Sequence, residues 1–295
     1  MGIKSSNVRR LASAVCLGVL ATSLAGCGSD GEIKEPDLVK GASEGGELTI
    51  GISFDQPGIG TADETGEEDG VTTGENPEGF DVDTATYVAK ALGVEESSIT
   101  WVKADPGERE SLLEEGKVDM VVSSYTITPE REKVVDFAGP YFEAHQDLLI
   151  RRNDQELLNP QDLNDRTLCS VENTTSAENI LDKYDKADIT LVLYETFSQC
   201  VEALAEGDVD AVSTDNVILA GFAAESDYKG VLKLMGEEFS DEPYGIAVPK
   251  GSTELVGQIN DALKQYVDDG SWKASLNKNV ADSGFDIPDP PTPGE

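Results

Sequence analysis

Short apolar runs alternate with amphipathic runs along residues 46–285. The apolar runs predict buried strands, and runs with apolar residues three or four positions apart predict helices. In the segment 83–92, Ala85, Val88 and Leu92 recur at helical spacing just before a glycine, which commonly ends helices. The resulting predictions are strands at 48–53, 118–122, 167–171 and 209–215, and helices at 83–92, 108–115, 177–184, 216–222 and 254–267. This alternation predicts an α/β fold.

One helix–glycine–strand unit occurs twice. Residues 112–121 match residues 203–212 at six positions, in the order Leu, Glu, Gly, Val, Asp and Val. In both copies a helix ends at a glycine, Gly116 or Gly207, and leads directly into a buried strand. The recurrence predicts two lobes of similar construction. A chance match between two ordinary units is the alternative.

The order of the elements predicts two crossings between the lobes. Residues 148–152 leave the first lobe and residues 242–249 return to it, so the first lobe comprises 47–150 and 244–285 and the second 151–243. The amphipathic helix 254–267 then packs on the first lobe. Two crossing strands form a hinge with a ligand cleft beside it, and closure about such a hinge is a standard motion.

Polar segments flank and interrupt these lobes. Residues 60–78 are rich in Gly, Glu, Asp and Thr and are interpreted as a long surface loop. Their acidic residues do not match the spacing of a calcium-binding EF-hand loop, so a solvated loop is favoured over a calcium site. The proline-rich residues 286–295 are predicted to be a disordered tail.

The N-terminus has the layout of a secretory signal. Lys4, Arg9 and Arg10 precede an uncharged apolar run, which is shorter than a membrane-spanning helix. It ends in Leu24-Ala-Gly-Cys27, which resembles a bacterial lipobox. We therefore expect a signal peptide at 1–26, lipidation of Cys27, a flexible tether at 27–46, and a location outside the cytoplasm, anchored to the outer face of the cell membrane. An ordinary cleaved signal with an incidental cysteine is the alternative.

The charge of the chain limits its possible binding partners, and its cysteine content predicts a disulfide. The 295-residue chain carries a formal net charge of −36, and loss of the positive signal makes the mature protein more acidic still. Such a charge argues against nucleic acid and anionic lipid as partners, and it would suit a salty environment. In an oxidising compartment, Cys169 and Cys200 are expected to form a disulfide, with two buried free thiols as the alternative. With a single histidine, His145, we expect no metal and no cofactor.

Four motifs carry a resemblance to a known family. They are residues 79–83, 118–131, 135–141 and 209–215. Together they resemble the polar amino-acid solute-binding proteins of ABC importers (bacterial extracellular solute-binding proteins, family 3), with glutamate-binding lipoproteins as the closest group. The resemblance implies the two-lobed type II periplasmic-binding-protein-like fold. It also implies a monomer, not an enzyme, that captures glutamate or aspartate, with glutamine as the weaker candidate, and delivers it to permease subunits.

The resemblance also implies a binding site for the main chain of an amino acid. Arg131, helped by Ser124 and Thr126, corresponds to the arginine that grips the ligand α-carboxylate, and a guanidinium suits a carboxylate because it donates two parallel hydrogen bonds. The alternative for Arg131 is a surface salt bridge with Glu130 or Glu132. Asp215 corresponds to the aspartate that holds the ammonium, with a helix N-cap as its alternative role.

A turn in the second lobe and an arginine in the first complete this expectation. Thr174, Thr175 and Ser176 lie in a turn that holds a ligand carboxylate in the family, although this chain has Glu172 and Asn173 where many members have glycine. Arg109 matches an arginine near the ligand of acidic-amino-acid binders and would set specificity. An exposed helical partner for neighbouring Glu residues is its alternative. Phe54 and Gln56 are weaker candidates for the cleft wall.

Two rival functions share this fold. One is an exported cyclohexadienyl or prephenate-type dehydratase, which would need a general acid or base in the cleft. His145 is interpreted as a packed or hinge residue, so only carboxylates remain for that chemistry. The other is an amino-acid sensor subunit, which the sequence does not distinguish from an importer subunit.

Overall fold

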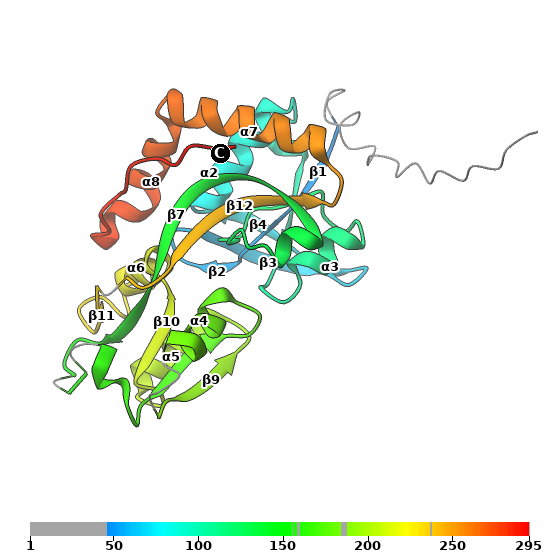
Figure 1. The fold of residues 1–295 in the computed structure, drawn as a ribbon. Helices are drawn as coiled ribbons and strands as arrows, with labels where there is room; N and C mark the ends of the chain where they lie inside the picture. Colours follow the sequence, from blue (N-terminus) through cyan, green and yellow to red (C-terminus); the bar gives the residue numbers. More distant parts are fainter. Residues whose placement is uncertain (1–45, 155, 158–159, 184–187, 237, 295) are drawn as a thin grey trace, which may run out of the picture. The chain divides into compact units, whose positions relative to one another are not determined.

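The computed structural model of the protein describes residues 46–294 except 155, 158–159, 184–187 and 237 (Figure 1). The predicted signal peptide, the lipidation site Cys27 and the tether up to residue 45 lie outside the described residues. No helix in the described part of the chain is long and apolar enough to cross a membrane.

The first lobe is built on one mixed sheet. Its strands are β1 (Leu48–Ile52), β2 (Asp55–Gln56), β3 (Gly60–Glu68), β4 (Val71–Glu78), β5 (Ile99–Lys103), β6 (Met120–Val121), the first part of β7 (Val135–Arg151) and β12 (Asp241–Pro249). Strands β5, β1 and β6 run parallel, and β12 lies antiparallel to β6. The helices that accompany them are α2 (Phe80–Ala91), α3 (Arg109–Glu114), α7 (Thr253–Asp268) and α8 (Ser271–Val280), with short 3-10 turns η1 (Glu96–Ser98), η2 (Arg131–Lys133) and η4 (Ala281–Ser283).

The second lobe repeats the plan. Its strands are β8 (Thr167–Val171), β9 (Thr190–Tyr194), β10 (Ala211–Asp215), β11 (Leu232–Leu234) and the end of β7, and its helices are α4 (Thr175–Lys183), α5 (Phe197–Glu206), α6 (Asn216–Ala224) and the 3-10 turn η3 (Pro160–Leu163). Strands β9, β8 and β10 run parallel, and β7 lies antiparallel to β10. The sheet order β9-β8-β10-β7 therefore corresponds to β5-β1-β6-β12 in the first lobe.

The two copies of the helix–glycine–strand unit occupy equivalent places. Gly116 and Gly207 both have a left-handed backbone, with φ of 66° and 92°, which glycine adopts without steric cost. The aspartate of each copy also makes an equivalent bond: the Asp119 carboxylate accepts from the N–H of Thr49 (2.7 Å), and the Asp210 carboxylate from that of Thr167 (2.9 Å). Each aspartate ties its strand to the start of the neighbouring parallel strand, which confirms the repeat.

Strand β7 carries the chain from one lobe to the other. Residues 135–145 pair with β12, and residues 146–150 pair with β10. The change of partner falls between His145 and Gln146, so the predicted lobe boundary at residue 150 was too late. The boundary is set by which strand β7 pairs with. The sequence does not reveal this change of partner, because its apolar run continues through residue 150.

The acidic segment 60–78 is a β-hairpin, and its interpretation as a surface loop was wrong. Strands β3 and β4 pair antiparallel, and β4 joins the main sheet where Thr73 and Gly74 pair with β5. The hairpin turns at Asp69 and Gly70, whose φ values of 52° and 75° fit a two-residue type I′ turn. The Asp-Gly pair was the available sequence signal, and the polar composition of the strands concealed it.

The C-terminal segment is also ordered against the first lobe, contrary to the predicted disordered tail. Phe285 and Ile287 are partly buried and pack against the main hydrophobic core. The N–H of Gly294 donates to the carbonyl of Gly139 (2.7 Å). These contacts hold a proline-rich segment that belongs to no helix or strand.

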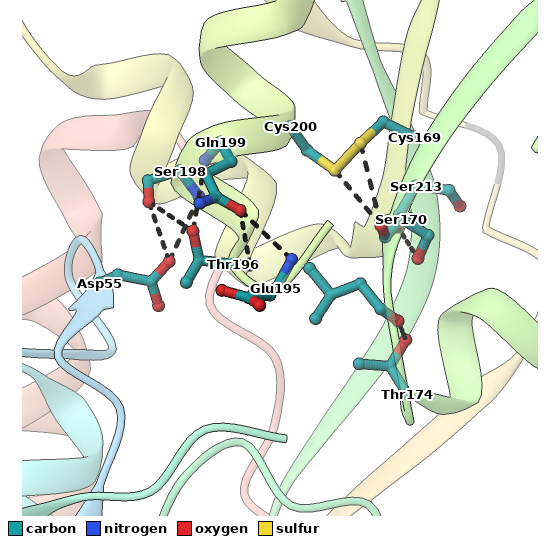
Figure 2. The surroundings of a disulfide bond; sticks show 11 residues. Asp55, Cys169, Ser170, Thr174, Glu195, Thr196, Ser198, Gln199, Cys200 and Ser213 are labelled. Carbon is teal, nitrogen blue, oxygen red and sulfur yellow. Dashed lines mark hydrogen bonds between the residues drawn. A yellow bond between two sulfur atoms is a disulfide. The ribbon is translucent and has the colours of Figure 1, made fainter. Parts of the chain in front are cut away.

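The predicted disulfide between Cys169 on β8 and Cys200 on α5 is present (Figure 2). Both residues are buried, and the bond fastens α5 to β8, which lies between β10 and β9 in the second-lobe sheet. Strand β8 leads into the 173–176 turn, so the covalent link lies directly behind a predicted ligand-binding segment.

We expect the double variant Cys169→Ala/Cys200→Ala to lose about 2–4 kcal/mol of unfolding free energy, because the bond closes a loop of sequence separation 31. Urea unfolding of the oxidised protein and of the variant measures this difference. Reducing agent should lower the stability of the wild type and leave the variant unchanged. Equal stability of variant and oxidised wild type would contradict the disulfide.

Candidate functional site

A narrow cavity lies between the two lobes, and its volume is about 20 Å³. Its lining residues are Gln56, Pro106, Arg109, Ser124, Thr126 and Arg131 from the first lobe, and Thr174, Thr175, Ser176, Phe197, Thr214, Asp215 and Ile218 from the second. All predicted ligand-binding residues except Phe54 line it. Phe54 instead belongs to the main hydrophobic core, where its ring lies over Gly74 of β4.

Arg131 reaches across the cavity from turn η2. Its Nη1 donates to the carbonyl of Thr126 (2.8 Å), and its Nη2 lies 3.5 Å from the carbonyl of Asn173 in the second lobe. Its Nε lies 4.0 Å from a carboxylate oxygen of Glu110. The guanidinium is thus aimed into the cleft by its own lobe, and the exposed salt bridge considered as an alternative does not describe it.

Arg109 is buried at the start of α3, with 3% of its surface exposed, so the exposed-helix alternative is wrong. Its guanidinium lies 4.0 Å from the centre of the Tyr125 ring, and that of Arg131 lies 4.8 Å from the same ring. Burial and the neighbouring charge of Arg131 lower the pKa of Arg109 to about 10, which keeps it charged at neutral pH. The Arg109 Nε has no hydrogen-bond partner among the described residues.

Asp215 is the buried carboxylate of the cavity. One oxygen accepts a hydrogen bond from the Tyr244 hydroxyl (2.6 Å), while the other, Oδ1, is buried without a partner in the described part of the chain. Burial, reinforced by the charge of Glu242, raises the pKa of Asp215 to about 7. The residue precedes α6, but its side chain makes no capping bond there. Its alternative role as an N-cap is therefore not seen, and Oδ1 remains available to a donor.

The second-lobe turn presents backbone donors to the cavity. The Thr174 hydroxyl accepts from the N–H of Ala177 (3.2 Å) and donates to the carbonyl of Val171 (2.7 Å). As the first residues of α4, Thr175 and Ser176 have N–H groups with no intrahelical acceptor, an arrangement that favours anions. Asn173 has a φ of 60°. Asparagine tolerates this left-handed conformation better than most residues, so it can occupy the position where the resemblance led us to expect glycine.

Asp81 shapes the first-lobe wall, and the sequence analysis did not single it out. Its buried carboxylate accepts from the N–H of Ser124 (2.7 Å) and from the Tyr141 hydroxyl (2.7 Å). Ser124 itself has a φ of 40°, and its hydroxyl donates to the side-chain oxygen of Gln56 (3.0 Å). The signal was present in the motif 79–83, where an acidic residue occupies a buried position at the start of a helix.

His145 lies on β7 at the point where the strand changes lobes, outside the cavity lining. Its Nδ1 is 3.0 Å from the carbonyl of Ser240 and 3.3 Å from a carboxylate oxygen of Asp241. Of the two interpretations, packed or hinge residue, its position fits the hinge, and 37% of its side chain is exposed.

Comparison with known proteins agrees with this geometry. The sequence profile of the bacterial extracellular solute-binding proteins, family 3, matches residues 48–281. The chain belongs to this family.

Relatives of this family-3 protein carry names that describe binding. It is 36% identical to the glutamate-binding protein GluB of Corynebacterium efficiens over 97% of this chain and 95% of the relative. It is 32% identical to the glutamine-binding protein GlnH of Bacillus subtilis, covering 86% and 91%. A solved ancestral arginine-binding protein bound to arginine superposes with a TM-score of 0.69 at 33% identity, covering 79% of this chain and 97% of that one. The fold is therefore the type II fold of amino-acid-binding proteins.

Burial raises the pKa of Asp81 to about 7, although its hydrogen bonds oppose the shift. Because this value exceeds the unfolded value of about 4, the folded state binds the proton more tightly, and the stability contributed is lost as pH rises through about 7. We expect the unfolding free energy of the family-3 protein, minus that of Asp81→Asn, to fall between pH 4 and 7 by up to about 1.4 kcal/mol per pH unit. Urea unfolding across this range measures it.

The exposed acid variant Asp208→Asn is the control for the loss of one acidic side chain. Identical pH slopes for Asp81→Asn and wild type would show that the Asp81 carboxyl does not titrate in this window.

Proposed function

We propose that this protein captures a free acidic amino acid, glutamate first, outside the cytoplasm and delivers it to the permease of an ABC importer. The observation that carries the proposal is the pairing of opposite charges across one cavity. Two guanidiniums, Arg109 and Arg131, come from the first lobe, and the unpartnered oxygen of Asp215 comes from the second.

An α-amino acid fits this pattern of charges. Its α-carboxylate would bind Arg131 and the free N–H groups at the start of α4, while its ammonium would donate to Asp215 Oδ1. An ammonium placed there would offset the unfavourable burial of the Asp215 carboxylate, whose pKa is raised to about 7 without such a partner. Each end of the ligand would thereby satisfy a group that is costly to bury alone.

Arg109 supports an acidic side chain on the ligand. A second buried cation beside Arg131 is unfavourable in an empty cleft, since each guanidinium repels the other. A ligand with a second carboxylate would relieve this repulsion and would reach the unpartnered Nε of Arg109. Glutamine would fill the same space without the charge. The GluB relatives support glutamate, and the GlnH relative makes glutamine the closest competitor.

Binding would require the lobes to separate and close again. A cavity of about 20 Å³ is far smaller than the several hundred Å³ of ligand pockets, because side chains of both lobes already contact each other across it. Within the described residues the chain passes between the lobes only along β7 and β12. Rotation at these strands would open the cleft by breaking the contacts that α5 and α6 make with β2, including the bonds from Ser198 to the Asp55 carboxylate. A ligand that bridges the lobes would favour the closed state.

The lipid anchor at Cys27 and the location outside the cytoplasm are part of the proposal and rest on the N-terminal sequence. A sensor subunit would use the same cleft, so a permease partner is what separates the two roles. A dehydratase would need a mobile proton at the reacting atoms. Asp215 is the only carboxylate among the lining residues, and the Tyr244 hydroxyl occupies one of its oxygens, an arrangement that supports binding.

We expect Arg131→Ala to weaken glutamate binding by at least about 30-fold, because it removes the partner of a desolvated carboxylate. Calorimetry with the unlipidated protein measures this loss. Lys133→Ala is the matched control, because Lys133 lies in the same turn with 70% of its side chain exposed and pairs with Glu130. Wild-type affinity in Arg131→Ala would rule out the site. Failure of the wild type to bind any amino acid would direct attention to the dehydratase.

We expect Arg109→Met to reduce the ratio of glutamate to glutamine affinity by about tenfold or more, since methionine keeps much of the side-chain volume and removes the charge. Titrations of both ligands into the variant and the wild type give this ratio. A loss that is equal for the two ligands would remove Arg109 from the specificity role and leave it a structural residue.

A further inference from the structure

Glu242 is a buried carboxylate between the lobes, with 2% of its surface exposed. It lies at the start of β12, where the chain returns to the first lobe. Its Oε2 accepts hydrogen bonds from the Thr126 hydroxyl and the Thr175 hydroxyl, both at 2.8 Å. Its Oε1 accepts from the side-chain amide of Asn179 (2.9 Å) and from the Ser240 hydroxyl (2.6 Å). Each carboxylate oxygen therefore has two donors.

These bonds fix the direction of two cavity hydroxyls. A hydroxyl has one proton and two lone pairs, and an ionised carboxylate can only accept. Thr126 and Thr175 both line the cavity, and both give their single proton to Glu242. Toward any other neighbour they can therefore act only as acceptors, so the Thr126 hydroxyl does not donate to the ligand carboxylate as the resemblance implied.

We propose that Glu242 is a positioning residue that holds Thr126 and Thr175 as hydrogen-bond acceptors, so that with Asp215 Oδ1 they form a three-acceptor site for the ligand ammonium. The inference rests on the proposed function and adds the residue that gives the ammonium end its polarity. An ammonium has three N–H donors, which matches three acceptors. A carboxylate or a hydroxyl placed at the same point would find too few donors.

The arrangement also joins recognition of the ammonium to closure of the lobes. Thr126 belongs to the first lobe, whereas Thr175 and Asp215 belong to the second. The three residues therefore line one cavity only when the lobes approach each other, and Glu242, at the hinge, bonds to Thr126 of the first lobe and to Thr175 of the second. The charge of Glu242 also reaches Asp215, where it helps to raise the pKa of that carboxyl. A cation between them is thus favoured by both acids.

Glu242→Gln separates this role from simple packing. With its NH₂ group at the Oε2 position, the amide can donate to both Thr hydroxyls, and its oxygen can accept from Asn179 and Ser240, so every partner stays satisfied. The Thr126 and Thr175 protons must then turn away from residue 242. The variant keeps the shape of the network and inverts the polarity of the two hydroxyls.

We expect Glu242→Gln to weaken glutamate binding by about 10- to 100-fold, because two acceptors of a charged donor become donors. Binding of glutarate, which has both carboxylates and no amino group, should change by no more than about threefold. Competition calorimetry with the two ligands measures the contrast. Asp241→Asn is the matched control, because it neutralises the adjacent acid, whose side chain is 88% exposed, and it should leave both affinities unchanged. Equal losses for glutamate and glutarate would overturn the proposal.

Neutron diffraction of the deuterated protein without ligand tests the hydroxyl polarity independently of binding. The wild type should show the Thr126 and Thr175 deuterons on the lines to Glu242, and Glu242→Gln should show them turned away. Deuterons that point elsewhere in the wild type would overturn the proposal even if glutamate binds. Correct deuterons in a protein that binds no amino acid would instead refute the proposed function.

Discussion

The pairing of one long strand with two different partners is the constraint on which the structure depends. Strand β7 pairs with β12 up to His145 and with β10 from Gln146 onward, so one strand belongs to the sheets of both lobes. Because β12 returns beside it, the residues at the crossover lie at fixed points relative to both sheets. Tyr244 and Glu242 on β12 can therefore bond to Asp215 and Thr175 of the second lobe, and the cavity is assembled around this crossover.

The cleft carries buried positive charges although the molecule as a whole is strongly negative. A chain of net charge −36 repels an anionic ligand at a distance. Beside the cavity, both guanidiniums lie over the ring of Tyr125, whose π face attracts cations. Because the cavity is desolvated, these charges interact with their neighbours much more strongly than exposed charges do. Buried acids then balance them, so the lining presents opposite charges on the two lobes in the pattern of a zwitterion.

Most of the fold could be predicted from the sequence because the patterns that indicate its helices and strands are local. The repeated helix–glycine–strand unit depends on apolar spacing and on Gly116 and Gly207, and both features act within a few residues. The hairpin at 60–78 was not predicted, because its strands are polar on both faces and depend on pairing with β5. The order of the C-terminal segment was not predicted for a related reason. Phe285 packs it against a core that local composition does not reveal.

For the site, the sequence by itself determined the residue types and their order: two arginines, an aspartate at the end of a strand, and hydroxyl residues before a helix. Tertiary structure alone decided which of their atoms are already bonded. The partners that orient the cleft, Asp81 for Ser124 and Glu242 for Thr126, are distant along the chain. Hydrogen-bond direction depends on burial and on where the lobes place each donor. No pattern of neighbouring residues encodes that, because it arises only when two sheets meet at the hinge.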